Sequence, residues 1–310
     1  MASYTFTSYS THPVYLTVFT NDDIARYYDL SEGHYRLFWN LGKARSLHYG
    51  YWDATTKSFH EALLRINEVL ADWAAIKEGE TVLDAGCGVG GSSLWLARER
   101  KCHVIGISLN ERQVSKANLY ARQANVAGQV FFEQKDFTNT SYPDGSFDVV
   151  WAIESVCYTD DKARFLREAF RVLKNGGRLV MADFFKKENL QGTEADSVKR
   201  WANGWAINDF ATIEDFSRQL TETRFRDIEI IDASEAIMPS ARRLYRSYLM
   251  GIIPAKLYQL FNPKATLLGR NNVNTAYLQY NTLKQGLWTY KLIKAGPCPL
   301  KGELRSKRLY

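Results

Sequence analysis

The pattern of apolar and polar residues divides the chain into three segments. From Asp22 to about Gly79 the apolar residues recur at helical spacing, which predicts a helical N-terminal segment rich in aromatic rings. From Glu80 to about Phe185 short apolar runs alternate with helical stretches, a pattern typical of a parallel sheet with crossover helices. The last segment is mixed: residues 226–233 and 287–296 predict strands on either side of a long, mostly helical insertion from Ser234 to Lys284.

These segments predict the domain organisation of an α/β protein. We expect a helical cap or substrate segment at 1–78, a Rossmann-like core at 79–186, and the C-terminal part of the fold at 187–300. Within that last part, residues from about 234 to 284 are expected to form a helical lid. The tail at 301–310 resembles a vector-derived extension as much as native protein, and we expect it to be either disordered or vector-derived.

The composition supports a folded protein with a full core. A length of 310 residues and a hydrophobic content of 45% suffice for one large or two modest domains. No run of 18 apolar residues is present, which argues against a membrane span. The chain contains 8 Trp, 18 Tyr and 16 Phe residues, and such rings either fill a core or line cavities for apolar or cationic molecules.

Net charge and cysteine usage bear on the binding partners and the cellular compartment of the protein. A net charge of +6 permits contact with nucleic acid, an anionic membrane surface or a phosphate-bearing small molecule, and the densest internal basic group is Arg242, Arg243 and Arg246. The four cysteines form no CxxC pair and no metal-ligand spacing with the histidines, so we expect no metal site and a reducing compartment. No export or organelle signal is evident at the N-terminus, which predicts a cytoplasmic protein.

A glycine-rich loop follows the first predicted strand of the core. Gly86, Gly88 and Gly91 spell G-x-G-x-x-G, a string shared by nicotinamide-binding and adenosyl-binding folds. A dinucleotide enzyme carries Asp or Glu about 20 residues further on to hold the ribose. Here the second strand ends in Ser108 and Leu109, with Gln113 one turn into the next helix. The second strand therefore disfavours a nicotinamide oxidoreductase, which stays open as an alternative.

Five motifs in order carry a resemblance to a known family. The run from Val82 to Phe185 resembles the class I S-adenosylmethionine-dependent methyltransferases. The motifs are VLDAGCGVGGSS, VIGISLNERQ, EQKDF, YPDGSFDVVWAIES and RVLKNGGRLVMADF. The resemblance implies a seven-stranded, mostly parallel sheet with helices on both faces and S-adenosyl-L-methionine as the cofactor, with S-adenosyl-L-homocysteine as its product.

Within this family, the chain most resembles methyltransferases that act on apolar small molecules. WAIESVCYTDDKARFLREAFRVLKNGGRL is similar to sterol C-methyltransferases and tocopherol-type methyltransferases. Tyr28, in YYDL, matches the entry segment of the sterol group, and the run His48 to Trp52 is similar to a signature of the tocopherol group. Residues 35–42 depart from the acidic, glycine-bearing stretch of the sterol enzymes.

The motifs assign roles around the cofactor. The glycine loop would meet its methionine part while Asp84 holds the ammonium group. The ribose would be held near Ser108 and Leu109 and by the amide of Gln113, since no carboxylate ends the second strand. Asp136 would accept from the adenine amino group, and Tyr28 would close over the carboxylate. The expected cofactor residues are Tyr28, Asp84, Gly86, Cys87, Gly88, Ser108, Leu109, Gln113, Asp136, Phe137 and Ile153.

The catalytic candidates lie where this fold presents groups to the methyl acceptor. Glu154 directly follows the fourth predicted strand of the core. A carboxylate and aromatic faces can stabilise a carbocation, so we expect C-methylation of an isoprenoid, terpenoid or sterol-like acceptor, a prenyl diphosphate included. The alternative is O- or N-methylation of an aromatic or alkaloid-like molecule with His48 or Glu154 as base. The candidates are Glu154, His48, Tyr49, Tyr51 and Tyr158.

Other classes of function stay open. A cyclase or a lipid-binding protein on the same fold would bind the cofactor without transferring its methyl group. Residues 152–155 lack the Asn/Asp-Pro-Pro-Tyr/Phe run of amino-methylating base enzymes, which disfavours nucleic acid as a substrate. The apolar side of the insertion would cover an apolar acceptor or pack in a homo-oligomer, and its arginines could meet a pyrophosphate or a membrane surface.

Overall fold

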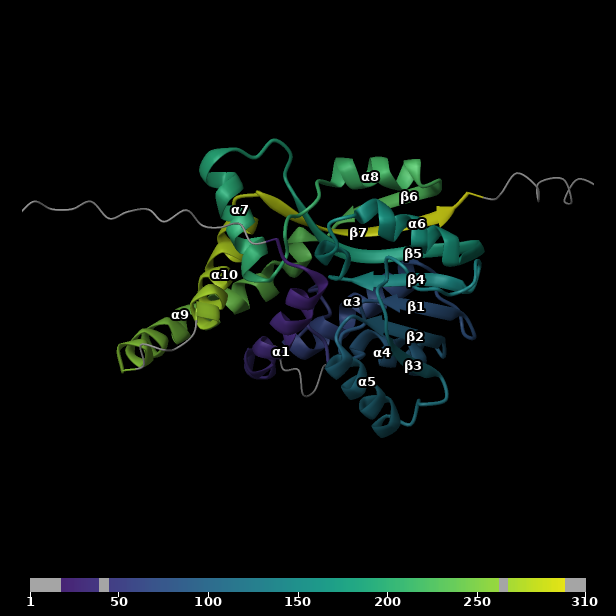
Figure 1. Cartoon of the computed structure of the whole chain (residues 1–310), viewed down its shortest axis with the longest axis horizontal. Coiled ribbons are helices and arrows are strands. Elements are labelled where there is room, and N and C mark those ends of the chain that lie inside the picture. Colours follow the sequence, from purple (N-terminus) through teal and green to yellow (C-terminus); the bar gives the residue numbers. More distant parts are fainter. Residues whose placement is uncertain (1–17, 39–44, 262–266, 299–310) are drawn as a thin grey trace, which may run out of the picture.

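The computed structural model describes residues 18–38, 45–261 and 267–298, with side chains described for 18–29, 45–250 and 275–298. A seven-stranded sheet forms the centre of the molecule, in the order β3-β2-β1-β4-β5-β7-β6 (Figure 1). The strands are β1 (Thr81–Ala85), β2 (His103–Ser108), β3 (Val130–Gln134), β4 (Phe147–Ile153), β5 (Leu173–Lys186), β6 (Phe225–Asp232) and β7 (Trp288–Pro297). This confirms the predicted α/β fold, with β7 antiparallel to both of its neighbours.

Strand β1 lies in the middle of the parallel part of the sheet. It pairs with β2 on one side and with β4 on the other, so that Asp84 lies opposite both Gly106 and Trp151. Its residues Val82 and Leu83 are buried, as expected of a strand covered on both faces. Because these strands are parallel, the carboxyl ends of β1, β2 and β4 meet at one edge of the sheet, where open α/β sheets bind ligands.

Because successive side chains of a strand point to opposite faces of the sheet, the strands contribute to two hydrophobic cores, one on each face. Val149 and Trp151 of β4 point into one core, and Val150 and Ala152 point into the other. The first core is covered by α3 (Phe59–Trp73), α4 (Gly91–Glu99) and α5 (Glu111–Gln123). The second is covered by α6 (Lys162–Val172) and α8 (Ile213–Glu222). The helices predicted on both faces are therefore present.

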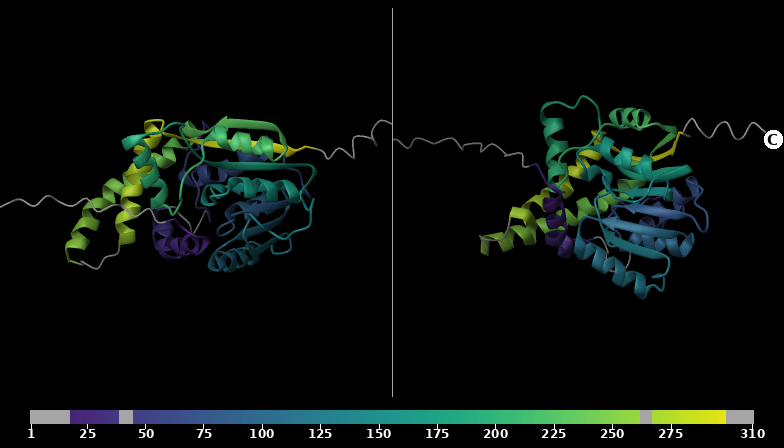
Figure 2. Two further views of the ribbon diagram at one scale, coloured as in Figure 1. Left: turned by 45° about the horizontal axis from the view of Figure 1, so that its top comes forward. Right: turned by 45° about the vertical axis from the view of Figure 1, so that its right-hand side comes forward.

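Three further helical elements surround the ligand-binding edge. Helix α1 (Asn21–Phe38) lies near α5 and the ends of the strands, and the short 3-10 helix η1 (Val156–Tyr158) directly follows β4 (Figures 1 and 2). Helix α7 (Gly192–Gly204) packs beside α10. In the predicted N-terminal helical segment, the described residues form the helices α1 and α3, which confirms its helical character over that part.

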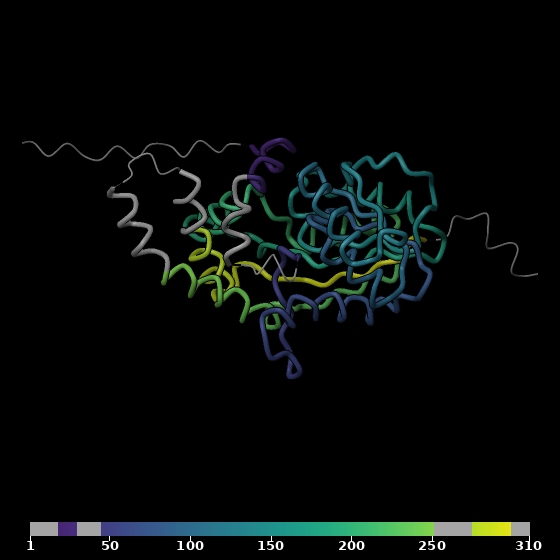
Figure 3. Tube along the Cα trace, turned by 90° about the horizontal axis from the view of Figure 1, so that it is seen from below, coloured from purple at the N-terminus to yellow at the C-terminus, as the bar shows by residue number. Residues whose placement is uncertain are grey.

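The predicted insertion is a pair of helices between β6 and β7. Helix α9 (Ser234–Phe261) and helix α10 (Leu267–Lys284) pack against each other and project from the body of the molecule (Figures 1 and 2). After the insertion, β7 runs from the helical hairpin across the sheet (Figure 3). This confirms a helical insertion before the last strand. Its role as a lid stays a prediction, and the tail at 301–310 lies outside the described residues.

Candidate active site

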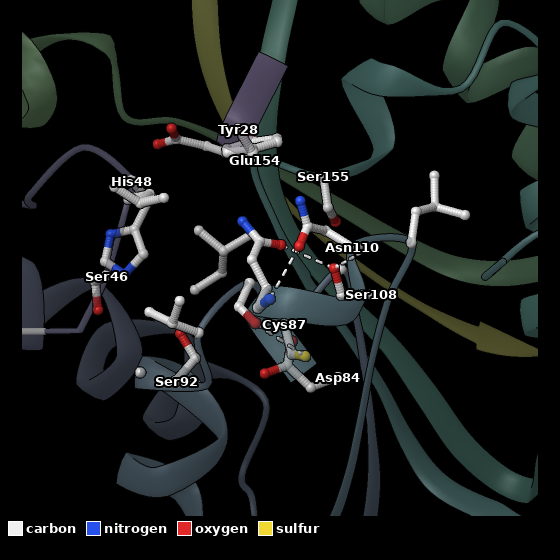
Figure 4. Close-up of a pocket in the computed structure, with 18 of the residues that line it drawn as sticks. Tyr28, Ser46, His48, Asp84, Cys87, Ser92, Ser108, Asn110, Glu154 and Ser155 are labelled. Atoms are coloured by element: carbon white, nitrogen blue, oxygen red, sulfur yellow. Dashed lines mark hydrogen bonds between the residues drawn. The ribbon is translucent and has the colours of Figure 1, made fainter. Parts of the chain in front are cut away.

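A pocket opens at the edge where β1, β2 and β4 end and α1 crosses them (Figure 4). In the close-up, Ser108 and Asn110 lie on one side, Ser46 and His48 on the opposite side, and Asp84 and Cys87 at the base. The residues that line it are Ile24, Ala25, Tyr28, Arg45, Ser46, Leu47, His48, Asp84, Gly86, Cys87, Gly88, Val89, Gly91, Ser92, Ser108, Leu109, Asn110, Gln113, Phe137, Ile153, Glu154, Ser155 and Tyr158.

The glycine loop forms the floor of the pocket. Gly86 has a φ of +93°, and a Cβ placed there would lie 2.3 Å from Cβ of Ser155, so only glycine fits. The amides of Gly86 and Cys87 donate to the carbonyl of Ile107 at 3.0 and 2.9 Å, so these two donors are already used. At Gly88 a Cβ would meet no atom within 4 Å. A ligand can therefore approach the backbone most closely from Gly88 onwards.

Asp84 stands buried at the base of the pocket. Its Oδ2 accepts a hydrogen bond of 2.5 Å from the hydroxyl of Ser93 in α4. Burial raises the pKa of the Asp84 carboxyl to about 6, although the hydrogen bonds from Ser93 oppose this shift. A carboxyl group so close to its titration point becomes an anion readily when a cation is placed beside it.

The end of β2 is preorganised by a short polar chain. The hydroxyl of Ser108 donates to Oε1 of Gln113 at 2.8 Å and accepts from the amide of Asn110 at 3.2 Å. This fixes the carbonyl oxygen of the Gln113 side chain, so its NH₂ group is the part left to a ligand. The arrangement fits the expected contact between the Gln113 amide and a ribose hydroxyl.

The side chain of Asn110 caps α5 with one end and contacts α1 with the other. Its Oδ1 accepts from the amide of Gln113 at 3.0 Å and caps α5. Its Nδ2 donates to the carbonyl of Ala25 at 2.8 Å and to Oδ1 of Asp29 at 3.0 Å, both in α1. The helix cap can be predicted from sequence, whereas the contact with α1 depends on the tertiary fold.

Glu154 follows β4 in a strained conformation. Its φ of +49° lies in the left-handed region, which is uncommon for a residue with a side chain and is often found at functional sites. Its Oε1 accepts from the amide of Tyr49 at 2.7 Å and from the hydroxyl of Tyr290 at 2.8 Å. Desolvation raises the pKa of the Glu154 carboxyl well above its ordinary value, against the opposing effect of these two donors.

His48 is a buried, neutral histidine on the wall of the pocket. Its Nδ1 lies 3.0 Å from the carbonyl oxygen of Tyr49, which can only accept, so Nδ1 carries the proton. Burial lowers the pKa of the imidazole to about 4, so the other nitrogen, Nε2, holds a free lone pair at neutral pH. Nε2 is buried and has no hydrogen-bond partner in the described part of the protein. Nε2 can therefore accept a proton or a hydrogen bond at neutral pH, although the low pKa makes it a weak base.

The turn η1 is held from below by two buried charged residues. The ammonium group of Lys162 donates to the carbonyls of Cys157 and Thr159, and Asp183 accepts from the amide of Cys157 at 2.9 Å. On the other side of the turn, the ring of Tyr158 lies 5.7 Å from that of Tyr28 in α1. Lys162 and Asp183 therefore position the part of the pocket wall, at Tyr158, that contacts α1.

The structure brings most of the predicted site residues to this pocket but leaves three of them outside its lining. Tyr49 is fully buried beneath it, and its hydroxyl donates to Gln279 at 2.5 Å. Tyr51 packs against the hydrophobic core. The carboxylate of Asp136 accepts from Thr138 and from Asn21 of α1. Tyr49 does reach the site through its main chain, which contacts both Glu154 and His48.

Several pocket residues were missed by sequence reasoning. Arg45, Ser46 and Leu47 directly precede the predicted His48, and Ile24 and Ala25 stand one turn before Tyr28. Helical spacing from Tyr28 could have indicated Ile24 and Ala25. Nothing in the local pattern distinguishes residues 45–47, because their place depends on how this segment crosses the strand ends.

Many of the aromatic rings expected around an acceptor belong to the core. The ring of Trp201 packs at a tilt against those of Phe210 and Trp288, with centroids 4.4 and 4.3 Å away, and all three are almost fully buried. Tyr49 and Tyr290 join the same cluster through Phe184. Of the described residues, the rings that line the pocket come from Tyr28, Phe137 and Tyr158, besides the imidazole of His48.

A family of methyltransferase domains matches residues 83–181, which span the glycine loop, the end of β2 and the Glu154 turn. A 27-O-demethylrifamycin SV methyltransferase from Amycolatopsis mediterranei is 34% identical over 221 residues, which are 71% of this chain and 80% of that protein. The chain belongs to the S-adenosylmethionine-dependent methyltransferases. It is an enzyme of class I, as the motifs predicted, and its cofactor is S-adenosyl-L-methionine.

Other curated relatives confirm the narrower resemblance. A 2-methyl-6-phytyl-1,4-hydroquinone methyltransferase from Synechocystis is 29% identical and is aligned over 89% of this chain and 88% of its own length. A sterol 24-C-methyltransferase from Eremothecium gossypii is 34% identical over 56% of this chain and 47% of that protein.

Solved structures share the fold of this methyltransferase. The geranyl diphosphate C-methyltransferase of Streptomyces coelicolor aligns with a TM-score of 0.70 at 20% identity, over 90% of this chain and 97% of the other. The (4+2)-cyclase SpnF aligns with a TM-score of 0.71 at 24% identity, over 91% and 97%. At this level of identity the likeness concerns the fold alone.

The residues of the pocket fit the cofactor. The open backbone at Gly88 leaves room for the methionine part of the cofactor. The buried carboxyl of Asp84 suits its ammonium group, and the NH₂ group of Gln113 suits a ribose hydroxyl. Phe137 and Ile153 supply apolar surface for a purine ring. The bound cofactor would supply an electrophilic methyl group on a sulfonium, and the residues of the pocket would position it beside apolar side chains.

Proposed function

We propose that this methyltransferase transfers the methyl group to a hydroxyl oxygen of a largely apolar small molecule, with His48 as the general base. The observation that carries the proposal is the buried Nε2 of His48, which has a free lone pair and no partner among the described residues. A hydroxyl group needs a base as its oxygen becomes alkylated, whereas the bond-forming step itself needs only positioning and desolvation.

The proton path follows from the tautomer. As the acceptor oxygen takes the methyl group, its proton passes to Nε2 of His48, and the resulting imidazolium is stabilised by the Nδ1–H bond to the carbonyl of Tyr49. The pKa of about 4 keeps His48 unprotonated and ready before reaction. Because the proton leaves to solvent after turnover, no further group of the chain is consumed.

Two observations support an apolar acceptor that bears a hydroxyl. The described wall beside His48 and Glu154 carries the apolar residues Ile24, Leu47 and Ile153. The relatives at 34% and 29% identity are named for an O-demethylated rifamycin and for a phytylated hydroquinone, both of which fit that description. For this chain, the class of acceptor is part of the proposal.

C-methylation of an isoprenoid or sterol-like acceptor is the second candidate. Glu154 favours it, because its carboxyl, held by Tyr49 and Tyr290, shares the pocket with the rings of Tyr28 and Tyr158. Once ionised, a carboxylate there would stabilise a carbocation and then take its proton. It stands second because the rings of Tyr49, Tyr290 and Trp201, which such a reaction could use as a cage, are core residues.

The atom that receives the label separates the two candidates. The enzyme is incubated with cofactor bearing a deuterated methyl group and a panel of prenylated phenols, hydroxylated macrolactones, sterols and prenyl diphosphates. Mass spectrometry and NMR then locate the label. Label on a hydroxyl oxygen, lost in His48→Gln and still formed, at a lower rate, in Glu154→Gln, supports the first proposal. Label on carbon, lost in Glu154→Gln, replaces it with the second.

A further inference from the structure

Helix α9 carries an exposed stripe that the active site does not use. Arg242, Arg243, Arg246, Leu249 and Met250 are all exposed, and Met250 has 72% of its surface accessible. Counted from Arg242, the other four residues follow at i+1, i+4, i+7 and i+8, which places all five on one face of the helix. The basic residues occupy the end of the stripe nearer to the sheet, and two large apolar side chains occupy the other end. A soluble helix face seldom combines the two in this way.

A cluster of tyrosines lies beside the stripe. Tyr245 stacks on Tyr280 of α10 with ring centroids 4.9 Å apart, and Tyr248 lies 5.8 Å from Tyr277. Tyr277 is itself 44% exposed. Tyrosines are enriched where one end of the ring meets an apolar phase and the other meets water, as at the headgroup level of a bilayer.

The charge of the insertion is strongly positive. Between Ala236 and Lys284 the sequence contains seven Lys or Arg residues and no Asp or Glu, and Glu235 in the first turn of α9 is the one acidic residue of the insertion. One carboxylate two turns before Arg242 offsets only a small part of the positive charge of the stripe. Such a surface complements an anionic partner, and its exposed Leu249 and Met250 require that the partner also offers an apolar phase.

The stripe is joined closely to the active site. Ser240, just before it in α9, accepts a hydrogen bond from the amide of Gly50, and Gln279 of α10 accepts one from the hydroxyl of Tyr49. These contacts anchor the hairpin on the segment that carries His48. The hairpin projects away from the sheet (Figure 1), so that a flat surface can reach α9.

We propose that α9 lies on the surface of an anionic lipid bilayer, with Arg242, Arg243 and Arg246 at the headgroups and Leu249 and Met250 inserted beneath them. The described part of the chain contains no helix that is both long and apolar enough to cross a membrane, so the contact proposed here is made by the exposed stripe alone. An apolar acceptor dissolved in a bilayer would then be met next to the segment that bears His48. Contact with lipid does not depend on which atom is methylated.

Vesicle binding tests the proposal directly. The full chain is sedimented with vesicles of phosphatidylcholine alone and with vesicles that also contain phosphatidylglycerol, at low and at high salt. We expect binding to the anionic vesicles only, weakened by salt because exposed charges are screened. Arg242→Gln combined with Arg246→Gln should lower the partition coefficient by about twenty-five-fold, since each arginine contributes about fivefold near an anionic surface.

Two further variants make the test specific. Arg164→Gln combined with Arg167→Gln removes the same charge from the exposed face of α6, and it should bind like the wild type. Leu249→Ser combined with Met250→Ser should weaken binding while leaving its salt dependence in place. Arg243 is left unchanged in these variants because its guanidinium stacks on the ring of Phe59 at 4.7 Å.

Three results would overturn the proposal. One is equal binding to neutral and anionic vesicles, and another is an equal loss in the α6 control. The third is a dimer in light scattering that the Leu249 and Met250 variant abolishes while the wild type ignores vesicles, which would assign the stripe to a second copy of this chain. Circular dichroism on every variant excludes unfolding as the cause.

Discussion

The main-chain amide of Tyr49 donates a hydrogen bond of 2.7 Å to the carboxyl group of Glu154. The same oxygen of Glu154 accepts from the hydroxyl of Tyr290, so segments before α3, after β4 and in β7 meet on one atom. The carbonyl of Tyr49 in turn fixes the tautomer of His48. The two candidate catalytic groups are therefore oriented by a single residue, and a change at one should be felt at the other.

Removing one donor from this junction should slow turnover. In Tyr290→Phe we expect kcat to fall about tenfold, the equivalent of one hydrogen bond of about 1.4 kcal/mol, because Glu154 loses one of its two anchors. Tyr51→Phe removes the same atom from a ring outside the pocket lining and is the matched control. Steady-state kinetics on both variants test this, and equal kcat values would show that the Tyr290 bond has no part in positioning.

Replacing the proposed base should affect chemistry and spare cofactor binding. We expect His48→Gln to lower kcat by about a hundredfold to ten-thousandfold, the usual contribution of a general base, with little change in the cofactor Kd. His60→Gln, in α3, is the control histidine because it does not line the pocket. Since the pKa of His48 is about 4, its protonation should not reduce kcat between pH 5 and 7. A kcat that falls with a midpoint near 6.5 would contradict the neutral, buried assignment.

Cofactor affinity should depend on pH through Asp84. Burial raises the pKa of this carboxyl to about 6, so below that pH the free enzyme holds a proton that the ammonium group of the cofactor must displace. We therefore expect Kd to rise about tenfold for each pH unit below 6 and to level off above it. Calorimetry in buffers of different ionisation enthalpy should show proton release on binding near pH 6.

Asp84→Asn supplies the control for that titration. The variant should bind the cofactor more weakly at pH 7 and show a flat pH profile, because no proton is exchanged at this position. Asp148→Asn, which changes a carboxylate that pairs with Lys174, should keep the wild-type profile. A pH dependence that survives in Asp84→Asn would assign the titration to another group.

The raised pKa of Glu154 predicts a stability cost at neutral pH. In the folded state this carboxyl keeps its proton above the ordinary value of 4.5, whereas in the unfolded chain it is ionised there. At this position the folded state thus binds more protons, and the contribution of Glu154 to the free energy of unfolding falls as pH rises above about 4.5. Glu154→Gln lacks this loss, so its stability relative to the wild type should grow between pH 4.5 and 7. Urea unfolding at several pH values measures it, and a difference that shrinks with pH would refute the assigned direction.

The lysine beneath η1 should be required for both stability and binding. Lys162→Met leaves the carbonyls of Cys157 and Thr159 without their donor, at a cost of about 1–3 kcal/mol in the free energy of unfolding. Because the turn carries Tyr158, KM values should rise as well. Lys174→Met removes a partly exposed pair and should cost less than about 1 kcal/mol. Urea unfolding and steady-state kinetics together test the positioning role, which equal KM values would exclude.

The sequence predicted the parts of the site that contiguous residues form. The strand, loop and helix around Gly86 share a backbone geometry, since glycine is required where φ is positive and Ser155 approaches closely. The order of alternating strands and helices predicted the parallel sheet and hence the edge at which the motifs meet. The position of these features in the fold can therefore be predicted from the residues that form them.

Contacts between distant segments could not be predicted in this way. That Tyr290 of the last strand anchors Glu154, or that Gln279 of α10 receives the hydroxyl of Tyr49, depends on how the insertion folds back on the sheet. The same limit explains Tyr49 and Tyr51: an aromatic run near the site fits a pocket wall or a core equally well by composition. Only the packing of Phe184, Trp201 and Trp288 assigns Tyr49 to the core.

The double role of Asn110 has a kinetic consequence. One end of its amide starts the helix beside the cofactor site, and the other end holds α1, which walls the pocket with Ile24, Ala25 and Tyr28. Movement of α1 away from Asn110 would open that side of the pocket while the cap of α5 stays intact. Exchange of spent for fresh cofactor by this route would then be a step distinct from methyl transfer, with a rate that does not depend on the acceptor.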